Sequence, residues 1–180
     1  MKGCAENARK LSSAMALCNP SDLKQKLRPG QRLMGLDVGT KTIGLALSDS
    51  SLTVATPMET LRRTKFRDDL SRLRRIIAER GVDGLVIGLP INMDGSEGRR
   101  AQSVRQFAAN LLEAIDIPAA FWDERLSTAA VTRILLEAEV SRKRRRQVVD
   151  KMAAAYILQG ALDHLGQREA GATDRPMNRR

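Results

Sequence analysis

The order of the apolar segments limits what this chain can fold into more than any other feature. Leu33–Asp37 is a short apolar segment, a glycine-containing turn over residues 38–42 follows it, and Gly44–Asp49 has the pattern of a returning strand. Beyond this predicted hairpin, strand-like and helix-like segments alternate. This order predicts a mixed sheet with helices packed against it, because an intervening helix allows the next strand to run parallel to the last one.

The later segments can be assigned from their hydrophobic spacing. The predicted strands lie within Pro57–Leu61, over Gly84–Gly88 and over Ala119–Trp122. A helix over Arg67–Arg80 precedes the second of these strands, and a helix with apolar positions from Ala101 to Ile115 precedes the third. Two helices follow: one is capped by Ser127 or Thr128 and has apolar positions from Val131 to Ala138, and the last has apolar positions from Val149 to Ile157. We therefore predict an α/β fold in which a three-stranded antiparallel meander is continued by parallel strands, with flanking helices.

The two ends of the chain lack this periodicity. Residues 1–30 are interrupted by proline and glycine, so we expect a flexible N-terminal extension, and Met15 is a candidate internal start. Residues 166–180 are polar, and we expect a disordered C-terminal tail. The folded domain is predicted over residues 31–165.

The charge of the chain points to a polyanionic partner. Lysine and arginine number 31 against 21 aspartates and glutamates, which gives a net charge of +10. Such an excess favours nucleic acid over a membrane surface. Aromatic residues make up only 3% of the chain, so binding is expected to depend on phosphate contacts. No apolar run approaches the roughly 18 residues of a membrane helix, and we expect a cytoplasmic protein without membrane contact.

Histidine and cysteine offer little for catalysis or metal binding. His164 is the single histidine, and both cysteines, Cys4 and Cys18, precede the predicted core. A cysteine- or histidine-based metal site and a Ser–His triad are therefore disfavoured. Any metal chemistry is directed to carboxylates.

Three carboxylates lie next to apolar positions, where a charged side chain is unfavourable unless it has a partner or a function. Asp37 ends an apolar strand, Glu124 follows the strand that ends at Trp122, and Asp150 borders the apolar stripe in the predicted first turn of the last helix. Simpler interpretations exist: an aspartate that starts a turn, a loop ion pair, and an acid stabilised by the helix dipole. Ligand sites in open α/β sheets gather at the carboxyl ends of strands. Together the three acids could hold Mg²⁺ or Mn²⁺, and two such ions can promote phosphodiester hydrolysis.

Basic residues and a turn-rich loop accompany these acids. Leu89–Gly98 is either a flap over the site or a plain connector. A run of five bases precedes Asp150, where it could carry a phosphate-binding patch to the carboxylates or could simply be solvated. The residues expected to contact nucleic acid here are Arg125, Arg142, Lys143, Arg144, Arg145 and Arg146.

Four segments, taken in order, closely resemble the YqgF/RuvX family. They are GLDVGTKTIGLALSD at residues 35–49, GLPINMDGSEG at 88–98, DERLST at 123–128 and DKMAAA at 150–155, and the resemblance spans about residues 32–165. It implies an RNase H-like fold related to the RuvC resolvase, with nuclease activity. Matched motif by motif, it implies that the family's acids fall on Asp37, Glu124 and Asp150. The family's usual basic residue after the first motif is met by Lys41, which we expect to contact nucleic acid.

The resemblance favours one function and leaves others open. The favoured one is a metal-dependent nuclease in 5′ maturation of pre-16S rRNA, a monomer or weak dimer with the small-subunit precursor as a candidate partner. The alternatives are a Holliday junction resolvase in recombination or repair, and a non-catalytic, ribosome-associated RNA-binding protein. The DxGT sequence at residues 37–40 also resembles the phosphate loop of actin-like and sugar-kinase ATPases. Those folds need two such domains, and this chain is too short for both.

Overall fold

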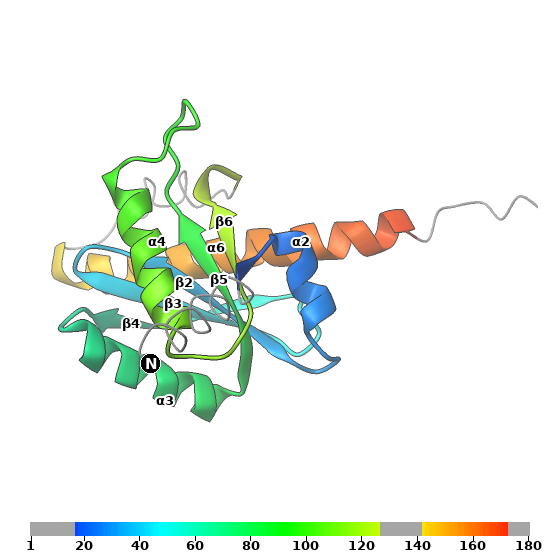
Figure 1. Ribbon diagram of the computed structural model, residues 1–180, viewed down its shortest axis with the longest axis horizontal. Coiled ribbons are helices and arrows are strands. Elements are labelled where there is room, and N and C mark those ends of the chain that lie inside the picture. The colour runs from blue at the N-terminus through cyan, green and yellow to red at the C-terminus, as the bar shows by residue number, and fades with distance from the viewer. Residues whose placement is uncertain (1–16, 127–141, 173–180) are drawn as a thin grey trace, which may run out of the picture.

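A six-stranded sheet in the order β1-β6-β5-β2-β3-β4 organises the molecule (Figure 1). The structure, a computed structural model, describes residues 17–126 and 142–172, with the side chains of the last helix described over residues 150–167. The strands are β1 (Leu17–Cys18), β2 (Arg32–Val38), β3 (Thr42–Ser48), β4 (Ala55–Arg62), β5 (Val82–Leu89) and β6 (Ala119–Asp123). The helices are α2 (Pro20–Leu23), η1 (Lys24–Lys26), α3 (Phe66–Arg80), α4 (Arg99–Leu112), η2 (Glu124–Leu126) and α6 (Arg142–Ala172).

Strand directions divide the sheet into two halves. β2, β3 and β4 form an antiparallel meander, whereas β5 runs parallel to β2, β6 parallel to β5, and β1 parallel to β6. This confirms the predicted α/β fold, with the meander first and the parallel strands after it. The helix predicted between Ser127 and Ala138 lies outside the described residues.

Helices cover both faces of the sheet. α3 and α4 lie on one face and α6 crosses the other, where it packs mainly on β3, β4 and β2 (Figure 1). Alternation along β2 sends Met34 and Leu36 into the core beneath α3 and α4, while Leu33 joins the core beneath α6. The described helices lack the length of apolar sequence that a bilayer-spanning segment would need.

Residues 17–30 belong to the folded domain, which corrects the boundary expected at residue 30. β1 pairs with β6, so that Leu17 lies opposite Ala119, and Leu23 of α2 is 1% exposed in the core beneath α6. A two-residue strand and a four-residue helix are too short to leave a periodic pattern, and tertiary contacts stabilise them. At the other end α6 continues to Ala172, past the tail expected from residue 166. Residues 1–16 and 173–180 lie outside the described residues.

Candidate active site

Asp37 is a buried carboxylate near the carboxyl end of a central strand. It is 4% exposed, and its neighbours Leu36 and Val38 point into the core beneath α3 and α4. Asp37 therefore faces α6. On β3, Gly44 lies directly opposite it. Burying an ionised group is costly unless a cation or hydrogen-bond donors compensate it, which makes Asp37 a candidate for a functional role.

Gly44 allows α6 to approach the sheet with its backbone. A Cβ on Gly44 would overlap the carbonyl group of Asp150. Only a residue without a side chain fits there. Since Gly44 pairs with Asp37, the contact brings Asp150 beside Asp37. The Asp150 Oδ2 atom is buried, and no hydrogen-bond partner for it lies among the described residues.

The position of Asp150 within its helix differs from the predicted one. α6 begins at Arg142, so Asp150 lies more than two turns beyond the first residue rather than in the first turn. The dipole of a helix acts mainly on its first and last turns. Dipole stabilisation therefore does not account for this aspartate, and the simpler interpretation loses its basis.

Glu124 reaches the same end of the sheet from β6. Gly88 of β5 lies opposite Trp122, and a Cβ on Gly88 would lie 2.9 Å from Glu124 Oε1. The register between β2 and β5 pairs Leu36 with Ile87, which places Gly88 next to Asp37. The structure thus brings all three predicted acids to one end of the α6 face.

The donor set at this end suits a hard cation. All three side chains are carboxylates, and a buried oxygen of Asp150 has no protein partner among the described residues. In the described part of the chain, however, no three acidic, histidine or cysteine side chains already stand close enough to hold an ion together. The metal roles of the three acids therefore stay a prediction.

Arg125 pairs with Asp123 rather than with Glu124. Its Nη2 atom lies 2.7 Å from Asp123 Oδ2, its Nε donates to both carboxylate oxygens, and its Nη1 donates to the Asn92 carbonyl at 3.3 Å. The guanidinium holds the pKa of Asp123 below its ordinary value, against a smaller opposing effect of partial burial. The loop ion pair expected from the sequence exists, but Asp123 occupies it. A nucleic-acid contact by Arg125 stays a prediction.

Exposed basic side chains lie at the same end of the sheet as the acids. Lys41 is exposed in the β2–β3 turn, and this turn is tied to the end of β4 because Arg63 Nη1 donates to the Gly39 carbonyl at 2.8 Å. Arg62 and Arg99 are exposed where β4 ends and α4 begins. Sequence reasoning missed these arginines because only the strand directions place them here. The side chains of Arg142–Arg146 lie outside those described, although their backbone forms the start of α6.

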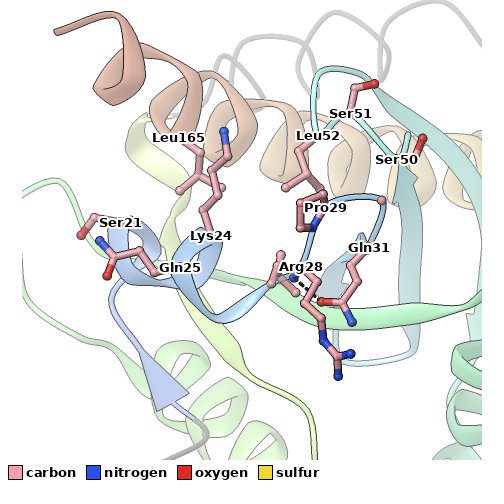
Figure 2. Close-up of a pocket in the computed structure, with 12 residues that line it drawn as sticks. Ser21, Lys24, Gln25, Arg28, Pro29, Gln31, Ser50, Ser51, Leu52 and Leu165 are labelled. Carbon is pink, nitrogen blue, oxygen red and sulfur yellow. Dashed lines mark hydrogen bonds between the residues drawn. The ribbon is translucent and has the colours of Figure 1, made fainter. Parts of the chain in front are cut away.

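A cavity elsewhere in the described part of the molecule is lined by charged side chains that do not point toward one another. It has a volume of about 610 Å³ and lies between residues 21–31, the β3–β4 turn and Leu165. In Figure 2 the charged ends of Lys24 and Arg28 point in opposite directions. Small-molecule sites bring a few polar groups toward one point. The carboxylate end of the α6 face is therefore the stronger candidate.

Comparison with known proteins gives the family. The RuvX family, described as Holliday junction resolvase, matches residues 31–164. The chain belongs to the RuvX family. A Paramagnetospirillum magneticum protein named "Putative pre-16S rRNA nuclease" is 63% identical over 150 residues, which cover 83% of this chain and 97% of that protein. A Methylocella silvestris protein of the same name is 53% identical, over 88% of this chain and 99% of its own.

A solved structure supports the fold of this RuvX protein. Thermus thermophilus RuvC in complex with a Holliday junction substrate matches 76% of this chain and 96% of its own, with a TM-score of 0.50 and 14% sequence identity. At that identity the likeness concerns the fold alone. The expected RNase H-like architecture related to RuvC is thus confirmed.

Proposed function

We propose that this protein is a metal-dependent nuclease that hydrolyses phosphodiester bonds in the 5′ maturation of pre-16S rRNA. The observation that carries the proposal is the convergence of Asp37, Glu124 and Asp150, with Asp150 Oδ2 buried and without a hydrogen-bond partner among the described residues. Membership of the RuvX family supports nuclease chemistry. The names of relatives that match over nearly their whole length support the RNA substrate, and pre-16S rRNA would place the protein in the cytoplasm.

The three carboxylates would hold Mg²⁺ or Mn²⁺, because both ions prefer oxygen ligands. Two such ions, when bound, supply Lewis acidity that activates water and stabilises the leaving oxygen of a phosphodiester. Asp37 is fixed by the sheet and Asp150 by the close contact of α6 with Gly44, so their relative position is set before substrate arrives. Lys41 and Arg62, exposed beside them, would orient the phosphate backbone.

The decisive test is a cleavage assay of the Asp37→Asn variant in Mg²⁺ or Mn²⁺, with pre-16S leader RNA and a four-way DNA junction offered side by side. We expect cleavage of the RNA to be lost while binding survives, because asparagine keeps the size of the side chain and removes its charge. Asp163→Asn is the matched control, since Asp163 is an exposed aspartate later on α6. Cleavage at the wild-type rate by Asp37→Asn would refute the carboxylate mechanism. Binding without cleavage by the wild-type protein would favour the non-catalytic alternative.

Junction resolution is the second candidate, because the family is described by that activity. Resolution requires two coordinated nicks and hence a symmetric pair of sites. The exposed large apolar side chains of the described residues come from separate elements, which gives no evident dimer surface: Leu17, Val54, Met93 and Leu126. Mass photometry with a junction decides between the two substrates. A two-to-one complex that makes paired nicks and leaves leader RNA intact would replace our proposal.

A further inference from the structure

The connection between β5 and α4 presents an apolar side chain to solvent. Met93 is 91% exposed, more than any other large hydrophobic side chain among the described residues. Its segment projects beyond the sheet at the end where β6 and η2 also terminate (Figure 1). Single exposed apolar residues are common on protein surfaces, so this exposure needs support from its surroundings.

The loop that carries Met93 is braced on both sides of it. The Asn92 N–H donates to the Ser96 carbonyl at 3.0 Å, and the Gly95 N–H donates to the Asn92 carbonyl at 2.9 Å. The Ser96 hydroxyl donates to Asp94 Oδ1 at 2.6 Å. Gly95 has a φ of +85°, a conformation that suits glycine. These contacts define a hydrogen-bonded turn that carries Met93 at its exposed side.

Arg125 connects this turn to the acids. Its Nη1 atom donates to the Asn92 carbonyl beside Met93, and its backbone lies between Glu124 and Leu126. Leu126 is 70% exposed. Met93 and Leu126 thus each follow in sequence a residue that takes part in this hydrogen bond, and Leu126 lies two positions after the proposed catalytic Glu124.

We propose that Met93 and Leu126 form an apolar contact for unpaired nucleobases beside the carboxylates. This inference rests on the proposed function and names its substrate class, which is single-stranded rather than base-paired RNA. The faces of bases are hidden inside a duplex and become available in single strands. We call the pair Met93 and Leu126 the base-contact pair.

The aromatic side chains of the chain support this assignment. They comprise three phenylalanines, one tyrosine and one tryptophan, and none of them is exposed. Stacking on aromatic rings is the usual way to hold unpaired bases. A flexible, polarisable methionine and a leucine are the apolar side chains that remain at this end for the same task.

The test measures binding, so it does not depend on cleavage. Short single-stranded RNAs that carry 2-aminopurine at successive positions, and the same sequences in duplexes, are titrated with the protein in the Asp37→Asn background. We expect Met93→Ser to weaken single-strand binding roughly fivefold, to abolish the 2-aminopurine response at one position and to leave duplex binding unchanged. The slope of binding against salt should not change, because no phosphate contact is removed. Leu126→Ser should show the same pattern more weakly.

Val54→Ser is the matched control, since Val54 is exposed in the β3–β4 turn at the other end of β3. Unchanged binding by Met93→Ser, or equal weakening of single strands and duplexes, would overturn the proposal. So would an effect of Met93→Ser that is confined to ribosomal precursor particles, which would identify a protein contact. Binding of duplexes without any binding of single strands would refute this inference alone, whereas no binding of either RNA would refute the RNA substrate as well. Cleavage that survives Asp37→Asn would refute only the mechanism.

Discussion

The two faces of the sheet are packed in different ways. Beneath α3 and α4, large side chains fill the space between helix and strands, including Leu36, Ile87, Leu73, Phe107 and Leu111. Beneath residues 150–158 of α6, the sheet instead contributes Gly35 and Gly44, which meet the helix backbone, and Gly88, which meets the side chains of Ile157 and Glu124. Side-chain packing supplies stability and can adjust to change, whereas contact between backbones fixes position. We infer that the first face holds the fold together and the second sets the distance between the acids.

The α6 face itself changes along its length. Leu33, near the start of β2, and Val86, which pairs with Gly35, belong to the core beneath α6. Further along the sheet, Asp37 of β2 lies beside Gly88 of β5. A Cβ on Gly35 would lie 2.7 Å from the Ala154 carbonyl oxygen. The apolar end of this face anchors the helix, which leaves the other end free to hold charged groups.

The largest effect is expected from Gly44→Ala. The new methyl group would overlap the backbone of Asp150, which cannot move without the helix. We expect the free energy of unfolding to fall by about 3 kcal/mol or more and cleavage by the folded protein to be lost. Gly166→Ala is the control on α6: nothing lies within 4 Å of its Cβ position, so stability should rise by about 0.5–1 kcal/mol. Full activity in Gly44→Ala would show that α6 does not set the geometry.

Leu111→Ala probes the opposite face. Leu111 lies on α4 and is fully buried against the sheet, and its truncation should lower the free energy of unfolding by about 2–4 kcal/mol. Since this face only supports the sheet, the folded fraction should cleave at the wild-type rate. Chemical denaturation and cleavage rates per folded molecule measure the two effects. If the cleavage rate per folded molecule falls as much as in Gly44→Ala, both faces of the sheet contribute equally to the geometry of the acids.

Leu23→Ala tests whether the N-terminal segment anchors the apolar end of the α6 face. Leu23 is buried among side chains that include Leu162 and Leu165. We expect a loss of about 2 kcal/mol in the free energy of unfolding, at the low end for a buried leucine because a short terminal segment can relax. Thermal unfolding checks this expectation. If Leu23→Ala lowers the free energy of unfolding by less than the exposed control Leu17→Ala does, the folded domain begins after residue 30 as the sequence predicted.

Asp49→Asn should have the smallest effect, and one that depends on pH. The N–H groups of Val54 and Thr53 hold the pKa of Asp49 below its ordinary value. Because the folded-state pKa is the lower one, the carboxylate stabilises the fold above the unfolded pKa of about 3.9, and this contribution is lost as pH falls through the folded-state value. The variant should therefore melt slightly below wild type near neutral pH, and the gap should close in acid. A gap that is constant with pH would assign the effect to something other than the charge.

The sequence predicted the order of the core elements because each has several buried residues at a regular spacing. α3, for example, buries Leu73, Ile76 and Ile77 at helical spacing, whereas β2 is a short, continuously apolar run followed by a glycine-containing turn. Residues 17–30 could not be assigned in this way. β1 has two residues, and its pairing with β6 depends on chain that lies about a hundred positions away.

The sequence predicted which acids form the site, but it did not predict the packing contacts that position them. Asp37 stands out in the sequence because a charge interrupts an apolar strand, and Gly44 and Gly88 stand in the motifs without an evident reason. Their reason is the close approach of α6 and of Glu124, which only the register between distant strands reveals. The choice of Asp123 over Glu124 as the partner of Arg125 likewise depends on side-chain direction after β6.

Metal binding by the Asp150→Asn variant shows whether α6 brings a ligand to the acids of the sheet. Titration with Mn²⁺, followed by the electron paramagnetic resonance of the free ion, compares wild type, Asp150→Asn and the control Asp163→Asn. We expect Asp150→Asn to weaken binding about tenfold or more, since even residues that only support a ligand change affinity by that factor. Its metal-free form should stay folded, because a buried oxygen without a hydrogen-bond partner among the described residues loses no contact there. Equal Mn²⁺ affinity in Asp150→Asn and wild type would contradict the account.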